Sequence, residues 1–239
     1  MYNYKFENGH CIVEIGGYKW MIDTGAPSFS FHNNITNVEI DGVTYKINLR
    51  PDYKATVEKT VGIPLVGIIG CDILSKTSFS LDVKGFFCFG LDYISTNNYI
   101  DVEIKTGVPE AKNNTILGNV NLNESIVKVL FDTGAHINYI NSGLVNPSQY
   151  QNQDYELIDY DFGGNVIFSK KHLTIGRLGK KAYKILFGIP KDSYSSPMRN
   201  MNALGCGAVI GLYNFEFNSP IFFECFGIDY KNKKLYISW

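Results

Sequence analysis

The sequence predicts an all-β protein built by duplication. Apolar and polar residues alternate in short runs such as Ile100–Lys105, and β-branched and aromatic residues are frequent. Helical patterning is limited to about one turn each at Asp72–Lys76 and Asn141–Val145. The segment Met21–Ala26 is similar in sequence to Leu130–Ala135, which indicates an internal repeat. We therefore expect closed or sandwiched antiparallel sheets in each half of the chain.

The repeat places equivalent strands in the two halves. A hairpin leads into each repeated segment, and the second strands of these hairpins are Tyr18–Ile22 and Ile126–Phe131. An apolar pair followed by glycine comes later in each half, at Ile68–Gly70 and at Val209–Gly211. These short apolar segments are typical of buried strands that end where two backbones approach closely.

The ends of the two halves also correspond. We predict a hairpin at the end of each half, at Ser80–Phe89 and at Phe226–Ile237. Between the halves, Ser95–Asn98 is short, polar and prone to form a turn. We therefore predict an N-terminal lobe over residues 1–98 and a C-terminal lobe over residues 99–239.

Composition narrows the classes of function. The 239 residues are 45% apolar and 19% charged, which is sufficient for a full core. Lys and Arg total 22 against 23 Asp and Glu, so we expect neither nucleic acid nor an anionic membrane as a partner. No apolar stretch approaches the roughly 20 residues that span a bilayer. Met1–Glu7 lacks the pattern of a signal peptide, which predicts a cytoplasmic location.

The cysteines favour neither disulfides nor a metal centre. Their number is odd and no Cys-x-x-Cys pair occurs, so a disulfide framework or a structural zinc site is not expected. We interpret them as buried free thiols. They are Cys11, Cys71, Cys88, Cys206 and Cys225.

The sequence Asp-Thr-Gly-Ala occurs twice, at Asp23–Ala26 and at Asp132–Ala135. One Asp-Thr-Gly is a common turn, but two copies, each after an apolar strand and each before an apolar-apolar-Gly segment, are highly specific. In these features the chain resembles the pepsin and retropepsin superfamily of aspartic peptidases over both halves. The resemblance implies a bilobal fold of two β-barrel lobes related by a pseudo-twofold axis, with each half similar to one retropepsin subunit. It also implies that Ile68–Gly70 and Val209–Gly211 pack against the two aspartate loops.

The residue types suit hydrolysis of a peptide bond without a metal or a nucleophilic side chain. One carboxylate takes a proton from water while one carboxylic acid polarises the carbonyl group, and Asp23 and Asp132 can supply both. Two carboxyl groups about 3 Å apart cannot both ionise, so the pair shares one proton. We expect an aspartic endopeptidase that cleaves an extended polypeptide between bulky apolar residues. Since one chain supplies both aspartates, a monomer is sufficient, and no cofactor is expected.

The other motif residues have supporting roles in this hypothesis. They are Thr24, Gly25, Ala26, Thr133, Gly134 and Ala135. The glycines let backbone amides approach the carboxylates, and the resemblance implies that the threonine hydroxyls link the two loops. The alanines match the retropepsin form, whereas pepsins usually carry a hydroxyl residue there. A hydroxyl would favour the charged carboxylate, so its absence predicts activity at weakly acidic to neutral pH.

The two halves differ in length between the aspartate and the later glycine. Asp23 and Gly70 are 47 positions apart, whereas Asp132 and Gly211 are 79 apart. The longer half contains an additional predicted hairpin, Leu157–Phe168, where a retropepsin carries its flap, the lid over bound peptide. We expect a single flap, contributed by the C-terminal half. Its expected substrate-binding residues are Tyr160, Phe162, Gly163 and Gly164.

Several interpretations of these residues stay open. The Leu157–Phe168 segment could be an ordinary surface hairpin, and the Asp41–Gly42 turn could form the flap instead. His136 matches a position that contacts the substrate backbone in retropepsins, but it could be a surface histidine. The apolar residues after the aspartate loops could line substrate pockets or belong to the core. These residues are Phe29, Phe31, Tyr139 and Ile140.

Other functions remain as alternatives to a general endopeptidase. A non-catalytic peptide-binding or interaction module could use the same fold, because a fold by itself does not establish activity. Such a module has no need for two aspartates, two threonines and four motif glycines, which favours catalysis. A processing enzyme with one natural substrate would share the chemistry and differ only in specificity.

Overall fold

The computed structural model describes residues 1–82, 84–95, 97–105, 114–178, 181–214, 219–221 and 224–238. The described chain is mostly β, as the sequence predicts. The strands are β1 (Tyr2–Glu7), β2 (His10–Ile15), β3 (Tyr18–Asp23), β4 (Phe29–Ser30), β5 (Asn37–Ile40), β6 (Val43–Lys46), β7 (Asn48–Leu49), β8 (Gly67–Gly70), β9 (Phe79–Asp82), β10 (Phe86–Cys88), β11 (Tyr99–Lys105), β12 (Thr115–Leu122), β13 (Ser125–Phe131), β14 (Asn138–Ile140), β15 (Leu157–Tyr160), β16 (Val166–Leu178), β17 (Lys181–Pro190), β18 (Ala208–Ile210), β19 (Tyr213–Asn214), β20 (Ser219–Pro220), β21 (Cys225–Asp229) and β22 (Lys234–Ser238). The α-helices are α1 (Lys54–Val61), α2 (Cys71–Thr77) and α3 (Ser196–Leu204), and short 3-10 helices cover Pro51–Tyr53, Ser142–Leu144 and Pro147–Gln149.

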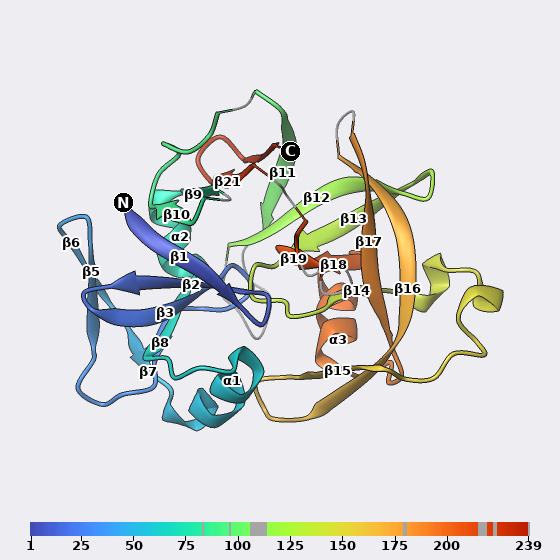
Figure 1. The fold of residues 1–239 in the computed structure, drawn as a ribbon, viewed down its shortest axis with the longest axis horizontal. Helices are drawn as coiled ribbons and strands as arrows, with labels where there is room; N and C mark the ends of the chain where they lie inside the picture. Colours follow the sequence, from blue (N-terminus) through green and yellow to red (C-terminus); the bar gives the residue numbers. More distant parts are fainter. Residues whose placement is uncertain are drawn as a thin grey trace.

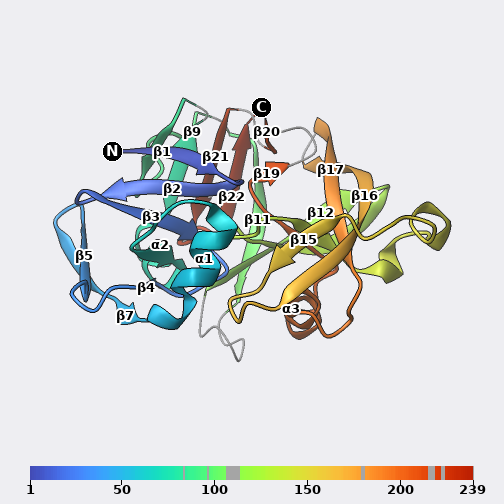
Figure 2. The same cartoon turned by 60° about the horizontal axis from the view of Figure 1, so that its bottom comes forward.

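The two halves of the chain lie side by side. In Figure 1 the strands from β1 to β8 gather on one side and those from β12 to β18 on the other. Figure 2 shows β21 and β22, the last strands of the chain, between the two groups. The C-terminal strands therefore join the halves.

Six strands form the antiparallel sheet that joins the halves, in the order β1, β10, β9, β21, β22 and β11. Both closing hairpins predicted from the sequence are present, as β9–β10 and β21–β22. Val83, in the turn of the first hairpin, lies outside the described residues. The hairpins pair with each other through β9 and β21, where Leu81 lies opposite Phe226.

The aspartate strands have the same neighbours in both halves. β3 runs parallel to β8 with Ile22 opposite Ile69, and β13 runs parallel to β18 with Phe131 opposite Ile210. After each aspartate loop the chain returns antiparallel to the same strand, as β4 on β8 and as β14 on β18. The predicted packing of the apolar-apolar-Gly strands is confirmed. Both central strands are buried throughout, which explains their apolar sequences.

The core contains apolar residues from both halves. The larger cluster includes the buried rings of Trp20, Phe131 and Phe226. A second cluster packs α3 against the C-terminal strands through residues such as Met201 and Val209. All five cysteines are buried and none forms a disulfide, as predicted from the sequence.

Two helices are additional to those predicted. α2 and the 3-10 turn after β14 fall where one turn each is expected, but α1 and α3 are not predicted. α1 buries only Val57 and Val61, so its sequence shows little apolar periodicity. α3 buries Met198, Met201 and Leu204, a helical spacing that the sequence analysis overlooks. Each of these helices directly precedes a central strand, β8 or β18, and so borders the aspartate loops.

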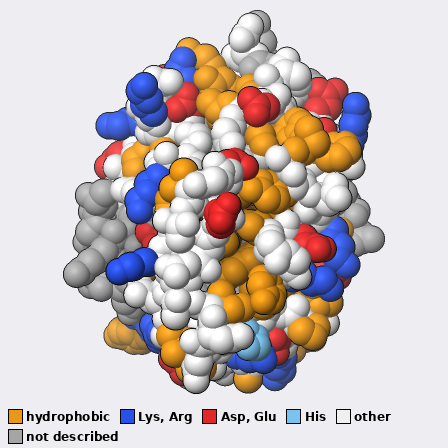
Figure 3. All heavy atoms as spheres, turned by 90° about the vertical axis from the view of Figure 1, so that its left-hand side faces the viewer, with side chains coloured by type: hydrophobic (Ala, Val, Ile, Leu, Met, Phe, Trp, Pro, Cys, Tyr) orange, Lys and Arg blue, Asp and Glu red, His pale blue; other side chains and the backbone are white. Residues whose placement is uncertain are grey.

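The surface of the N-terminal half carries charges of both signs. Figure 3 shows acidic and basic side chains distributed around apolar groups on this face. Tyr18, Val43 and Leu49 are among its exposed apolar residues. Among the described residues, none of the helices combines the length and apolar character needed to cross a membrane.

Candidate active site

Asp23 and Asp132 occupy equivalent positions in the two halves. Asp23 is the last residue of β3, and Asp132 directly follows β13. The Gly25 amide donates a hydrogen bond to Asp23 Oδ1 (2.7 Å), and the Gly134 amide donates one to Asp132 Oδ1 (3.0 Å). Each carboxyl group is thereby held over its own turn.

The two carboxyl groups also lie against each other's turns. A Cβ atom built on Gly25 would lie 2.4 Å from Asp132 Oδ2, and one built on Gly134 would lie 2.3 Å from Asp23 Cγ. Glycine is therefore required at both positions, because the opposite aspartate fills the space that a side chain would take.

Thr24 and Thr133 link the two turns. The Thr24 amide donates to Thr133 Oγ1, and the Thr133 amide donates to Thr24 Oγ1, both over 3.0 Å. Each hydroxyl then donates to a carbonyl of the other half, Thr24 Oγ1 to Phe131 O (3.1 Å) and Thr133 Oγ1 to Ile22 O (2.9 Å). Both threonines are buried. The hydroxyl-to-backbone linkage implied by the resemblance is therefore present.

Burial raises the pKa of both aspartates. Asp23 is only 3% exposed, and repulsion from Asp132 adds to the loss of solvation, so its pKa lies well above the usual range. Burial is also the main cause of the raised pKa of Asp132, which hydrogen bonds from the Gly134 amide and from Asp23 partly offset. The pair therefore retains one proton at a pH where isolated carboxyl groups are ionised, with the stronger effect on Asp23.

The alanines after the motif glycines lie where the loops cross the central strands. Ala26 O accepts hydrogen bonds from the Cys71 amide (2.9 Å) and the Cys71 thiol (3.1 Å). A Cβ atom on Gly70 would lie 2.1 Å from Ala26 O, and one on Gly211 would lie 2.6 Å from Ala135 O. The glycines that end the apolar strands thus permit a close backbone approach in both halves.

Two further residues that the sequence analysis misses hold these crossings. Ser28 Oγ accepts from the Gly70 amide (2.8 Å) and donates to Asp72 Oδ1 (2.6 Å). In the other half Asn138 Oδ1 accepts from the Gly211 amide (2.8 Å). The two residues hold matching positions in the repeat, directly before Phe29 and Tyr139, but their different residue types conceal the equivalence.

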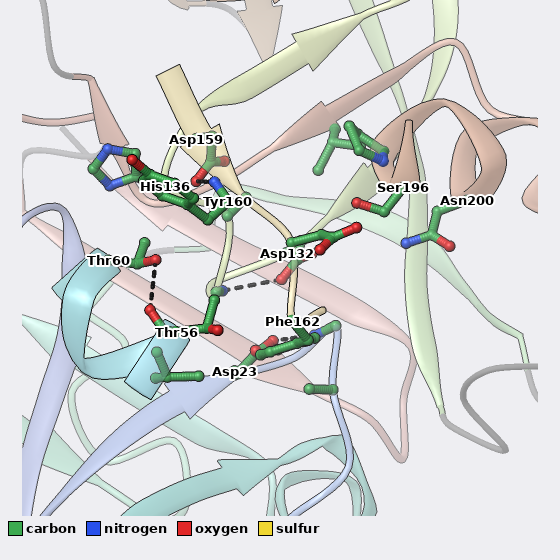
Figure 4. A pocket seen from close by; sticks show the side chains of 18 of the residues that line it. Asp23, Thr56, Thr60, Asp132, His136, Asp159, Tyr160, Phe162, Ser196 and Asn200 are labelled. Carbon is green, nitrogen blue, oxygen red and sulfur yellow. Dashed lines mark hydrogen bonds between the residues drawn. The ribbon is translucent and has the colours of Figure 1, made fainter. Parts of the chain in front are cut away.

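A cavity of about 650 Å³ lies over the carboxyl groups. The predicted site residues that line it are Asp23, Gly25, Ala26, Asp132, Gly134, Ala135, His136, Tyr160, Phe162 and Gly163. Thr24 and Thr133 do not line it, because they are buried within the linkage between the turns. Figure 4 shows Asp23 and Asp132 with Phe162, and in this view Asp159, Tyr160 and His136 gather on one side of the cavity.

The hairpin of β15 and β16 covers part of this cavity. Its strands pair from Leu157 opposite Ser169 to Tyr160 opposite Val166. At its tip the Phe162 ring reaches the N-terminal half and packs against other rings. The ring centroids lie 5.4 Å from Tyr53 and 6.1 Å from Phe29. The hairpin is thus part of the site wall and not an ordinary surface hairpin.

Two positions considered for the flap do not line the cavity. Gly164 has a φ of +80°, and a Cβ atom built on it would lie 3.5 Å from Thr56 Oγ1 on α1, but it is not among the lining residues. The Asp41–Gly42 turn, the alternative position for a flap, also contributes nothing to the lining. Asp41 instead accepts a hydrogen bond from the Tyr2 hydroxyl (3.0 Å).

A helix borders the cavity in the N-terminal half, facing the β15–β16 hairpin. α1 contributes the lining residues Thr56, Val57, Thr60 and Val61. The cavity is therefore enclosed by a hairpin from one half and a helix from the other.

His136 lines the cavity and contacts the N-terminal half. Its Nδ1 atom lies 3.0 Å from Asn8 O, and its ring stacks on that of His10 at 5.4 Å between centroids. His10 is buried, and burial followed by repulsion from His136 lowers its pKa to about 4. His10 is thus neutral near pH 7, and His136 is among the residues that line the cavity.

Asp159 is a third carboxyl group at the cavity, and it is not among the site residues predicted from the sequence. It lies on β15, 7% exposed, and accepts hydrogen bonds from the Tyr139 hydroxyl (2.6 Å) and the Tyr160 amide (2.7 Å). Its repulsion contributes to the raised pKa of Asp132. The alternation of polar and apolar residues along the strand does not distinguish Asp159 from a surface residue, because polar residues normally occupy the solvent side of a hairpin.

The four remaining candidates for pocket residues are all buried in the core. Phe29 and Tyr139 also line the cavity, whereas Phe31 and Ile140 do not. α3 adds the lining residues Ser196, Pro197, Arg199, Asn200 and Leu204, none of which the sequence analysis identifies.

Within the described ranges, no group of three or more His, Cys, Asp or Glu side chains is arranged to hold a metal ion. Comparison of the sequence with protein-family models finds no match, and comparison with curated proteins finds none either. The function is therefore inferred from the geometry of the site.

Proposed function

We propose that this protein is an aspartic endopeptidase in which Asp23 and Asp132 activate a water molecule. The observation that carries the proposal is reciprocal: each carboxyl group lies against the glycine of the other Asp-Thr-Gly turn. A peptide-binding surface does not require such an arrangement, since it holds the buried carboxyl group of Asp23 against the partly buried one of Asp132 despite their mutual repulsion.

We further propose a bilobal, pepsin-like architecture with lobes at residues 1–98 and 99–239. Support comes from the equivalent parallel pairs β3–β8 and β13–β18 and from the shared antiparallel sheet that includes β9 and β21. In this arrangement one chain supplies both carboxyl groups, and a monomer suffices for activity.

The protonation state of the pair supports a complete hydrolytic cycle. The Asp132 carboxylate takes a proton from water as the water oxygen bonds to the carbonyl carbon, and Asp23 gives its proton to the carbonyl oxygen. The product is a neutral tetrahedral diol. Asp132 then protonates the amide nitrogen while a diol hydroxyl returns a proton to Asp23, and the C–N bond breaks. Both aspartates regain their initial states.

The β15–β16 hairpin acts as the single flap in this proposal. Tyr160, Phe162 and Gly163 cover the bound polypeptide, and His136 contacts it at the rim. Exclusion of water by the flap strengthens the electrostatic interactions of the carboxyl pair. α1 takes the side on which a second flap would lie.

Cleavage of a peptide library with purified full-length protein tests the proposal. We expect Asp23→Asn and Asp132→Asn to reduce kcat/KM by about 100-fold to 10,000-fold, the contribution of a general acid or base. Asp154→Asn, at an exposed carboxylate outside the cavity, is the matched control and should retain activity. Undiminished cleavage by Asp132→Asn would refute the mechanism, and peptide binding without cleavage by the unmodified protein would favour the non-catalytic alternative.

A further inference from the structure

Among the described residues, the hydrogen-bond partners of the Asp159 carboxyl group are neutral. The Tyr139 hydroxyl and the Tyr160 amide donate to it, and the salt bridges found in the same residues all lie elsewhere. His136 and Asp161 are the titratable groups that act on it across space, with opposite effects. Burial raises the pKa of Asp159, and the charge of His136 partly offsets this effect.

Asp159 is directed to the same cavity as the catalytic pair. It is among the lining residues, and it lies close enough to Asp132 to affect the pKa of that residue. Figure 4 shows it with Tyr160 and His136 at one side of the pocket. A group bound to Asp159 would therefore occupy the substrate cleft and not a separate surface site.

Apolar side chains share the cavity lining with Asp159. Ile167, its cross-strand partner, is buried and lines the cavity, as do Leu130, Tyr139 and Val209. An apolar wall that carries one carboxylate matches a side chain with a long hydrocarbon stem and a cationic end. Lysine and arginine have this construction.

We propose that Asp159 terminates a specificity subsite for a lysine or arginine side chain of the polypeptide. The inference rests on the proposed substrate cleft but not on the chemistry of cleavage. The bound cation forms a direct ion pair with Asp159 beside the longer-range interaction with His136, and burial of the carboxylate strengthens that pair. The Tyr139 hydroxyl and the Tyr160 amide hold the carboxylate in position for it.

Binding measurements on the Asp132→Asn protein, which is expected to cleave peptides very slowly, test this subsite separately from catalysis. The probes are octapeptides that differ only in carrying lysine, arginine, norleucine or glutamate at one position, scanned in turn. At one position we expect lysine and arginine to lower Kd by about 10-fold to 100-fold relative to norleucine, the range of a charge-assisted hydrogen bond. Adding Asp159→Asn should remove this preference, while adding Asp154→Asn should retain it.

Tyr139→Phe distinguishes charge recognition from a structural role. It removes the hydroxyl donor but retains the Asp159 charge, so the preference for the cationic peptides should remain. Equal weakening of the lysine and norleucine peptides by Asp159→Asn would overturn the subsite, as would an unchanged preference. If the unmodified protein cleaves nothing yet its lysine preference depends on Asp159, the peptidase proposal fails and the subsite stands.

Discussion

The amide of Thr24 donates to the hydroxyl of Thr133, and the amide of Thr133 donates to the hydroxyl of Thr24, at the same distance of 3.0 Å. The two residues are 109 positions apart in the sequence. Because each hydroxyl also donates to a carbonyl of the opposite half, four buried hydrogen bonds depend on two side chains. The position of one aspartate is thereby coupled to that of the other.

Loss of one hydroxyl should weaken both the fold and the site. Thr24→Val preserves shape but leaves the Thr133 amide and the Phe131 carbonyl unsatisfied, so we expect it to lower the free energy of unfolding by about 2–5 kcal/mol. Thr24→Ser retains the hydroxyl and should cost about 1 kcal/mol for the lost methyl group. Urea denaturation measures both. Equal losses in the two variants would show that the hydroxyl contributes nothing.

A methyl group at Gly25 should disturb the opposite aspartate. The new Cβ atom would lie within 2.6 Å of Asp132 Oδ1, Oδ2 and Cγ, so we expect Gly25→Ala to reduce kcat/KM by at least about 100-fold. Gly143→Ala is the matched control, because the nearest atom to its Cβ, on Asn141, is 3.4 Å away. Steady-state kinetics on both variants checks this. Full activity in Gly25→Ala would exclude the reciprocal packing of carboxyl and glycine.

Stability should depend on pH through the carboxyl pair. The pKa of Asp23 is raised in the folded protein from its usual 3.8, so the folded protein keeps a proton that the unfolded chain releases. This contribution to stability is fully present below the unfolded pKa and is lost as pH rises through the folded pKa. We therefore expect Asp23→Asn to lose less stability than the unmodified protein as the pH rises above the usual pKa of 3.8. If urea denaturation shows that the free energy of unfolding changes equally with pH in Asp23→Asn and in the unmodified protein, the prediction is wrong.

A hydroxyl beside the carboxyl pair should move the acidic limb of activity. In Ala26→Ser the new hydroxyl can donate to the neighbouring carboxylate, which favours its charged form. We expect the acidic limb of the kcat/KM profile to shift to lower pH. Ala203→Ser, at an exposed position on α3 outside the cavity lining, should leave the limb in place. For the unmodified protein, a profile that peaks below about pH 3 would be inconsistent with the proposed role of Ala26.

Removal of the flap-tip ring should weaken substrate binding. Phe162 packs against Tyr53 and Phe29, and aromatic pairs contribute about 0.5–1.5 kcal/mol each. We expect Phe162→Ala to raise KM by roughly 10-fold, because the closed flap loses this anchor. Phe168→Ala removes a ring of the same hairpin that is 43% exposed and lies outside the cavity lining, and it should have little effect. Equal KM values for the two variants would argue against a flap.

The sequence alone determined the repeated elements of this protein. Two Asp-Thr-Gly-Ala copies, their apolar strands and the apolar-apolar-Gly segments predicted equivalent buried strands in both halves, because local periodicity and close backbone approach are recorded in short stretches of residues. The parallel pairing of β3 with β8 and of β13 with β18 differs from the antiparallel sheets that the sequence predicted. The length difference between the halves likewise predicted the Leu157–Phe168 hairpin.

Only the tertiary structure decided which distant residues share the cavity. α1 lines the cavity opposite the hairpin, although its largely polar sequence does not predict a helix. Asp159 is buried and accepts a hydrogen bond from Tyr139, although the alternation of polar and apolar residues in its strand is typical of a surface strand. Ser28 and Asn138 take equivalent roles with different chemistry. Such contacts depend on how elements pack across long separations, and packing leaves no periodic pattern in the chain.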